Sequence, residues 1–186
     1  MRIVGGRFRG HPIAAPRSAD IRPTSDKTRE AVFNILAHGA HPVAWDEIAV
    51  LDLFAGTGAL GFEALSRGAR SCLFVDTGAE ARGLIRRTIE ALGLEREAKV
   101  FRRDAAALGE AGSLGPFHLA FADPPYSQGL GERALAAAAR GGWLAPGALV
   151  VLEEAAGAEV AWPAPFAVYD RREYGAAAVA FARFAP

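Results

Sequence analysis

The chain has 186 residues, of which 51% are hydrophobic, and its 21 basic residues balance its 21 acidic ones. This length is enough for one well-packed core with a small extension, but it excludes two full domains. No apolar run is long enough to span a membrane, and the N-terminus carries arginines instead of the apolar stretch of a signal peptide, so we expect a cytoplasmic protein.

The first thirty residues hold seven basic and three acidic side chains, a net charge of +4, so the rest of the chain carries −4. Residues 2–13 form two short extended stretches interrupted by glycines, which predicts a small β-hairpin with exposed arginines. We therefore expect a basic N-terminal arm over residues 1–22, followed by one domain over residues 23–186. Local positive charge attracts phosphate, although a solvated arm without a ligand is the alternative. The candidate nucleic-acid-binding residues are Arg7, Arg9, Arg22 and Arg29.

After this arm, Ser25 or Asp26 is a suitable N-cap for a helix that ends near His38. From residue 48 onward, apolar runs alternate with helical segments, which is typical of a parallel sheet covered on both faces. We predict strands over residues 49–54, 71–76, 98–102, 119–122 and 148–152, and helices over residues 58–67, 80–92 and 131–140.

The last two extended runs, residues 167–173 and 177–184, are too close together for a crossover helix and must pair as a hairpin. The predicted fold is therefore α/β and Rossmann-like, with a mostly parallel sheet of seven strands that ends in a C-terminal hairpin. This is the shape expected of a class I methyltransferase. Cys72, in the second strand, is the only cysteine, so we expect a core residue and predict no metal site.

A glycine motif, Gly-Thr-Gly-Ala-Leu-Gly, follows the first predicted strand at residues 56–61. Glycines here let the backbone approach an adenosine-bearing cofactor, and Asp76, at the end of the next strand, is placed to accept hydrogen bonds from ribose hydroxyls. Asp52 lies four residues before Gly56, where it would repel a pyrophosphate but attract the cationic ammonium and sulfonium of S-adenosylmethionine. Its alternative role is to cap the amides of the loop.

Asp104 follows the third predicted strand, where it would accept the adenine amino group or cap the next helix. The candidate cofactor-binding residues are thus Asp52, Phe54, Gly56, Gly58, Asp76 and Asp104. Because the glycine motif also matches the dinucleotide fingerprint, an NAD(P)-dependent oxidoreductase is an alternative.

A second motif follows the fourth predicted strand and supplies the candidate catalytic residues, Asp123, Pro124, Pro125 and Tyr126. In an open parallel sheet, ligands bind at this end of the strands. The Asp123 carboxylate and the Pro124 carbonyl would accept the two N–H groups of a planar amine and stabilise the positive charge that develops on its nitrogen. Tyr126 would offer a face on which a base stacks. The alternative is a turn that ends the strand, with Tyr126 as a packing residue.

With these two motifs, the stretch Arg-Pro-Thr-Ser-Asp-Lys-Thr-Arg-Glu-Ala-Val-Phe-Asn-Ile-Leu at residues 22–36 resembles the RsmD family. The resemblance implies a class I methyltransferase that uses S-adenosylmethionine to methylate the N2 amine of a guanine in bacterial 16S ribosomal RNA. It also implies a substrate within an assembling small ribosomal subunit, with ribosomal proteins as further candidate partners and no membrane. We expect a monomer. An adenine-N6 methyltransferase of DNA or RNA is an alternative, and a non-catalytic RNA-binding module is another that would leave the cofactor loop unexplained.

Overall fold

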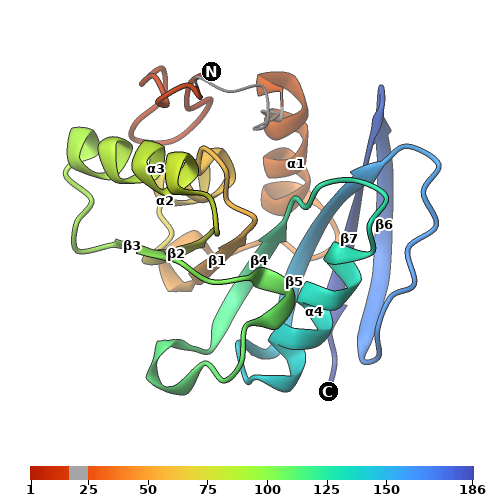
Figure 1. Cartoon of the computed structure of the whole chain (residues 1–186). Coiled ribbons are helices and arrows are strands. Elements are labelled where there is room, and N and C mark those ends of the chain that lie inside the picture. Colours follow the sequence, from red (N-terminus) through yellow and green to blue (C-terminus); the bar gives the residue numbers. More distant parts are fainter. Residues whose placement is uncertain (17–24) are drawn as a thin grey trace.

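The structure is a computed structural model that describes residues 1–16 and 25–186. In these residues one seven-stranded sheet forms the centre of the molecule, with the strand order β3-β2-β1-β4-β5-β7-β6 (Figure 1). This topology confirms the predicted fold class. The strands are β1 (Ala49–Leu53), β2 (Ser71–Val75), β3 (Ala98–Phe101), β4 (Phe117–Ala122), β5 (Leu144–Ala155), β6 (Phe166–Tyr174) and β7 (Ala177–Phe184).

Strands β1 to β5 pair in parallel, while β7 is antiparallel to both β5 and β6, as the predicted C-terminal hairpin requires. The predicted strand bounds agree with the structure to within two residues except at β5, which was expected over residues 148–152 and spans Leu144–Ala155. At its carboxyl end β5 pairs with β7 through Glu153 and Glu154. Glutamate is uncommon in strands, so the sequence alone did not predict that the strand continues through these two residues.

Four α-helices cover the sheet in the described part of the chain: α1 (Asp26–His38), α2 (Ala59–Ser66), α3 (Ala79–Leu92) and α4 (Leu130–Arg140). Ser25 caps α1 as expected, because its hydroxyl accepts the Thr28 N–H at 3.0 Å. Short 3-10 turns, η1 (Trp45–Glu47), η2 (Ala105–Ala107) and η3 (Gly112–Leu114), complete the elements. None of the helices formed by the described residues has both the length and the apolar character needed to cross a membrane.

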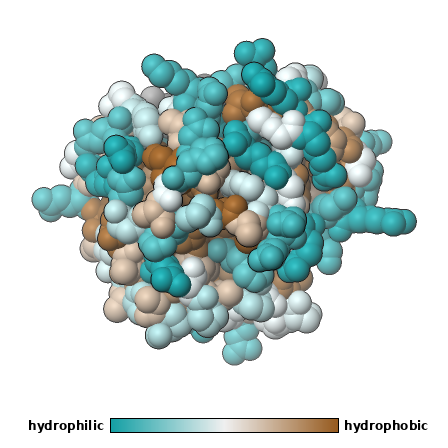
Figure 2. Space-filling model, turned by 180° about the vertical axis from the view of Figure 1, so that it is seen from behind, coloured by the Kyte–Doolittle hydropathy of each residue, from teal (hydrophilic) through white to brown (hydrophobic). Residues whose placement is uncertain are grey.

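Hydrophobic residues on the two faces of the sheet form two cores. Because side chains alternate along a strand, Val50 packs into the core under α1, α2 and α3, whereas Leu51 packs into the core under α4. Figure 1 shows these two layers, with α2 and α3 on one side of the sheet and α4 on the other. The face turned away in Figure 1 is mostly hydrophilic, with hydrophobic residues visible only in small separate areas (Figure 2).

The N-terminal arm differs from the predicted hairpin, because its two halves join through a single antiparallel bridge, Arg2 to Pro12, and form no strands. The two halves still exchange backbone hydrogen bonds, from the Ile3 N–H to the His11 carbonyl at 3.0 Å and from the Ile13 N–H to the Met1 carbonyl at 3.1 Å. Other donors of the arm bind α2: the Val4 N–H reaches a Glu63 carboxylate oxygen at 2.8 Å, and the Phe8 N–H reaches the Ser66 hydroxyl at 2.9 Å.

Ile3 and Ile13 belong to the same core as α1, α2 and α3, so the arm packs as part of the domain. The expected boundary after residue 22 lies outside the described residues.

Candidate active site

The predicted site residues meet at one edge of the sheet, where β1, β2 and β4 end side by side. Leu53 of β1 is in register with Val75 of β2 and with Ala122 of β4, so the next residues of these chains leave the sheet together. These residues are Phe54, Asp76 and Asp123, and ligands bind at such an edge in open parallel sheets.

The glycine loop turns sharply between β1 and α2. Phe54 has a φ of +56° and Gly58 a φ of +79°, and the left-handed conformation is costly for an aromatic residue. Gly61 is required for a different reason: a Cβ at this position would lie 2.3 Å from the Phe74 ring of β2. The loop therefore combines local backbone strain with close packing of α2 on the sheet, as the third glycine of this motif predicts.

Asp76 holds the loop through both carboxylate oxygens. One oxygen accepts the Gly56 N–H at 2.9 Å, and the other accepts the Gly78 N–H at 2.7 Å. These two hydrogen bonds join the glycine loop to the start of α3. The Asp76 side chain itself is half-buried and lines the pocket described below. Its predicted contact with a ribose remains a prediction.

Asp52 lies inside the protein with 2% of its surface exposed, and its carboxylate accepts the Gly61 N–H at 3.0 Å. The structure thus supports the alternative role for this residue, a cap on the amides that follow the loop. Burial raises the pKa of Asp52 well above its usual value, and the negative charges of Asp123 and Asp76 raise it further although the Gly61 hydrogen bond opposes the shift. Asp52 therefore interacts with both of the other carboxyl groups, which makes this edge attractive to a cation.

A pocket beside the loop joins the ends of β1, β2 and β3. Asp104 lies in its wall, is exposed, and accepts the Ala106 N–H at 2.8 Å, so it also caps η2. The two expected roles of Asp104, a cap and an adenine acceptor, are compatible with this position. The pocket is lined by Phe54, Val75, Asp76, Thr77, Arg103, Asp104 and Ala105.

The Asp-Pro-Pro-Tyr motif leaves β4 directly beside this region. Asp123 is half-buried and its N–H lies 3.4 Å from the Leu53 carbonyl, which keeps the start of the motif against β1. Pro124 is buried and Pro125 is exposed. Tyr126 is half-buried, and its hydroxyl donates to a Glu153 carboxylate oxygen at 2.6 Å. The motif is thus anchored at both ends.

The sequence reasoning missed Glu153 and Glu154, which are only 8% and 7% exposed at the end of β5. Glu154 accepts the Ser127 N–H at 2.9 Å, directly after the motif. Two consecutive glutamates that close the apolar run Leu-Val-Val-Leu at residues 149–152 were the signal that could have identified them.

The four arginines expected to bind nucleic acid have different positions. Arg7 and Arg9 are exposed at the tip of the arm, and Arg22 lies outside the described residues. For Arg29 the prediction is wrong, because its side chain is 0% exposed.

Arg29 is instead part of the packing between the arm, α1 and α2. Its guanidinium donates to the Arg2 carbonyl and to Asp26 at 2.8 Å, and its Nε lies 3.7 Å from the buried Glu63 carboxylate. A buried guanidinium with these partners cannot reach a phosphate.

Comparisons with known proteins agree with this geometry. The family model described as conserved hypothetical protein 95 matches residues 1–183. Ribosomal RNA small subunit methyltransferase D of Escherichia coli K12 is 36% identical over 153 residues, which cover 82% of this chain and 74% of the relative. The enzyme of the same name from Haemophilus influenzae is 32% identical over 155 residues, which cover 82% and 78% of the two chains.

Solved structures show the same fold over nearly the whole chain. The Escherichia coli protein yhhF superposes with a TM-score of 0.86 at 30% identity, covering 100% of this chain and 98% of the other. A hypothetical protein of Thermus thermophilus, TTHA0928, has a TM-score of 0.72 at 30% identity, with 97% and 98% of the two chains covered. The chain therefore belongs to the RsmD family of methyltransferases.

Proposed function

We propose that this chain transfers a methyl group from S-adenosylmethionine to the N2 amine of a guanine in small-subunit ribosomal RNA. The observation that carries the proposal is the position of Asp123: it starts an Asp-Pro-Pro-Tyr motif directly after Ala122, which is in register with Leu53 of β1, and its charge acts on Asp52. The names of the curated relatives support ribosomal RNA of the small subunit as the substrate.

The residues present fit this cofactor because the site is rich in carboxylates and the bound molecule is cationic. When bound, S-adenosylmethionine supplies the methyl group from a positively charged sulfonium. Asp76 and Asp104 line the pocket in which the adenosine would lie, with Phe54 in its wall. Gly56 and Gly58 would let the backbone approach the cofactor, while the charge of Asp52 would act through the loop that it caps.

Asp123 and Pro124 would act on the amine itself. A guanine N2 amine is flat and weakly nucleophilic because its lone pair is delocalised into the ring. The Asp123 carboxylate and the Pro124 carbonyl accept its two N–H groups, fix the nitrogen in position and stabilise the positive charge that develops on it. Tyr126 provides the aromatic face for stacking of the base. Neither acceptor has to reorganise during the reaction, since Pro124 and Pro125 restrict the backbone of the loop.

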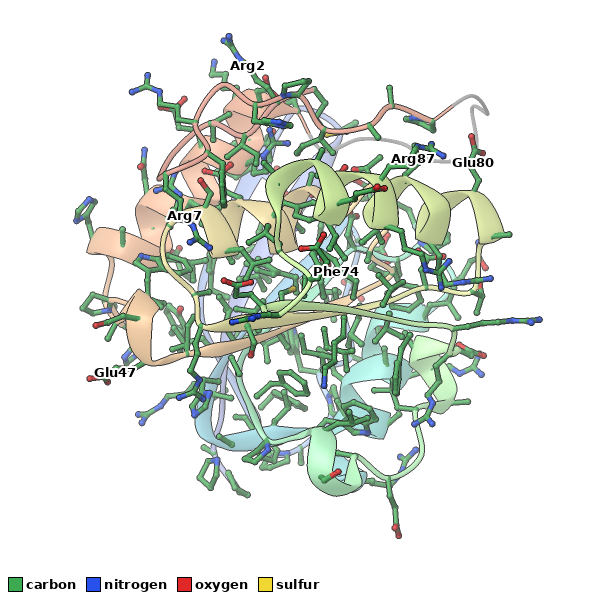
Figure 3. The ribbon with its side chains drawn as sticks, turned by 90° about the vertical axis from the view of Figure 1, so that its left-hand side faces the viewer. Arg2, Arg7, Glu47, Phe74, Glu80 and Arg87 are labelled. Atoms are coloured by element: carbon green, nitrogen blue, oxygen red, sulfur yellow. The ribbon has the colours of Figure 1, made fainter. Side chains whose placement is uncertain are left out.

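The arm supports contact with RNA away from the reacting base. The Arg7 N–H binds the carbonyl of Ser66, the last residue of α2, at 2.8 Å. With eight residues and a rise of about 1.5 Å per residue, α2 places this contact roughly 12 Å from the glycine loop where the helix begins. In Figure 3, Arg7 lies on the same side as Glu47, before β1, and opposite Glu80, after β2.

An RNA that places its base beside Asp123 and its backbone at Arg7 and Arg9 must therefore extend along the molecule. Such a substrate has to be several nucleotides long, and we propose that it is presented within an assembling small subunit. The proposed unit is a monomer, with ribosomal proteins as further partners.

Methylation of ribosomal RNA with labelled S-adenosylmethionine, followed by nucleoside analysis, tests the proposal. The substrates are free small-subunit RNA, partly assembled small subunits and large-subunit RNA as a control, and the negative control is Asp123→Ala. We expect labelled N2-methylguanosine from the small-subunit substrates only. Labelled N6-methyladenosine would favour the adenine alternative, and no transfer to any RNA would overturn the proposal.

A further inference from the structure

Strand β5 continues beyond the point where its neighbour β4 ends. Ala122, the last residue of β4, pairs with Leu152, and β5 then runs on for three residues to Ala155 while remaining paired with β7. On the β4 side the chain leaves as Asp123, Pro124 and Pro125. Because the two prolines have no N–H, the backbone ladder between β4 and β5 cannot continue there.

Side chains of β5 replace this missing ladder. Glu153 and Glu154 are 8% and 7% exposed, and a buried carboxylate is costly unless it is hydrogen-bonded. Glu153 accepts the Tyr126 hydroxyl at 2.6 Å, a short hydrogen bond within the normal range for a hydroxyl donor. Glu154 accepts the Ser127 N–H and the Ala155 N–H, each at 2.9 Å. The two glutamates thus hold the end of the Asp-Pro-Pro-Tyr loop on β5.

The backbone at this point is strained. Ser127 has a φ of +61°, in the left-handed region that a residue with a side chain rarely adopts. Such a conformation persists only where the surroundings fix it, and it is common at functional loops. The hydrogen bond from the Ser127 N–H to Glu154 is one contact that fixes it here.

We propose that Glu153 and Glu154 are positioning residues for methyl transfer: Glu153 orients the Tyr126 ring through its hydroxyl, and Glu154 fixes the exit of the loop at Ser127. The inference rests on the proposed function, in which Tyr126 stacks on the base and Asp123 accepts its amine. Neither glutamate contacts the substrate in this scheme. Glu153 acts through Tyr126, and Glu154 acts through the backbone of the loop that carries Asp123 and Tyr126.

The physical benefit is that the loop is ordered before the RNA arrives. A Tyr126 ring held only by packing would have to be fixed at the moment of binding, and this ordering would reduce the affinity for the RNA. A misplaced loop would also move the Asp123 acceptor away from the amine. The Asp76 carboxylate holds the glycine loop through Gly56 and Gly78, so the cofactor side of the site should keep its shape when Glu153 is changed.

Steady-state methylation kinetics on the full-length protein test this proposal, with Glu153→Ala, Glu153→Gln, Tyr126→Phe and the double variant Tyr126→Phe/Glu153→Ala. Glu153→Ala should lower kcat/KM for RNA by roughly tenfold to a hundredfold, since small displacements of a positioned group have effects of this size. Glu153→Gln should recover most of the activity, because its amide oxygen still accepts the Tyr126 hydroxyl. The double variant should lose clearly less than the product of the two single losses, because both changes remove the same hydrogen bond.

Cofactor affinity and the thermal midpoint are measured for each variant, and Glu159→Gln, at an exposed carboxylate, controls for the loss of a charge. Glu153→Gln and Tyr126→Phe keep the shape of the site, so they carry the test if Glu153→Ala does not fold. Wild-type kcat/KM in Glu153→Ala, or losses that multiply in the double variant, would overturn the proposal. Either result with an active wild-type enzyme leaves the methyltransferase function intact, whereas an inactive wild type contradicts that function instead.

Discussion

The carboxylate of Asp52 accepts the backbone N–H of Gly61 at 3.0 Å, and this hydrogen bond joins the end of β1 to the first turn of α2. Only 2% of Asp52 is exposed, and burial raises its pKa well above the usual value. The negative charges of Asp123 and Asp76 add to this shift. The glycine loop is therefore closed at a cost in stability at neutral pH, since ionisation of this carboxyl group is disfavoured in a buried and negatively charged place.

We expect Asp52→Asn to stabilise the protein in the absence of ligand at neutral pH. The amide oxygen of Asn still accepts the Gly61 N–H, while the buried charge and its repulsion from Asp76 and Asp123 are removed. Because the folded pKa of Asp52 is raised, its contribution to stability is complete below its unfolded pKa of about 3.9 and is lost as the pH rises through the folded pKa.

Urea unfolding of both proteins between pH 4 and pH 8 measures this effect. The advantage of the Asn variant should grow with pH, whereas its affinity for S-adenosylmethionine should fall because the site is less negative. An Asn variant that is less stable than the wild type at every pH would show that the Asp52 charge is compensated.

Replacing Asp123 with alanine should lower the rate of methylation about a hundredfold or more, since it removes an acceptor aimed at the charge that develops on the amine. Affinity for S-adenosylmethionine, measured by calorimetry, should stay close to that of the wild type. Asp123→Asn is the matched variant: it keeps one acceptor oxygen without the charge, so its rate should lie between those of Asp123→Ala and the wild type. A normal rate for Asp123→Ala would remove this residue from the proposed mechanism.

Asp76→Ala should weaken S-adenosylmethionine binding more than any other single change in the pocket. The carboxylate accepts the N–H groups of Gly56 and Gly78, so its loss removes a predicted ribose contact and also loosens the loop. Calorimetry on the wild type should show binding of S-adenosylmethionine and no useful affinity for NAD. An Asp76→Ala variant that binds S-adenosylmethionine as tightly as the wild type would remove this residue from the cofactor site.

The sequence predicted the sheet and the meeting of Asp76 and Asp123 because both follow from local patterns. Apolar runs mark the strands, and the carboxyl ends of parallel strands must share one edge. The burial of Arg29 depends on contacts with distant parts of the chain, since its partner Glu63 lies on α2 and is equally buried. The local sequence around a helical arginine is the same whether its side chain faces solvent or a buried carboxylate.

The N-terminal hairpin was predicted only in part, for a related reason. Its two halves pair in the antiparallel sense at Arg2 and Pro12, but they form no regular strands, because the Val4 and Phe8 donors bind Glu63 and Ser66 of α2. A Cβ at Gly6 would lie 2.0 Å from the Ser66 carbonyl, so the glycine serves close approach to α2. No local sequence pattern distinguishes a glycine in a hairpin turn from a glycine that allows close approach to a helix.

Arg29→Met should destabilise the protein by about 1–3 kcal/mol, because the Arg2 carbonyl loses its donor and the buried Glu63 carboxylate loses one of its two ion-pair partners. Urea unfolding measures this loss. Arg29→Met/Glu63→Gln should recover part of it, since a neutral amide can still accept the Val4 N–H without a buried charge. A single variant as stable as the wild type would mean that the remaining partner, Arg67, balances Glu63 by itself.

The exposed arginines at the tip of the arm should set the salt dependence of RNA binding. Each phosphate contact contributes a slope of about 0.7 for single-stranded and 0.9 for double-stranded nucleic acid to the fall of log K with log salt. If Arg7 and Arg9 each hold one phosphate, Arg7→Ala/Arg9→Ala should reduce the slope by roughly 1.4 to 1.8 and weaken binding, with no change in cofactor affinity.

Arg171→Ala/Arg172→Ala is the matched control for this measurement. These two arginines are also exposed, but they lie on β6 and pair with Glu173 at 2.9 Å and with Asp170 at 3.0 Å, so they add little free positive charge. Their removal should leave the slope unchanged. Titration of labelled small-subunit RNA at several salt concentrations distinguishes the two faces: equal slopes in the wild type and in the arm variant would mean that the RNA binds elsewhere, and a change confined to the β6 variant would place it on the C-terminal hairpin.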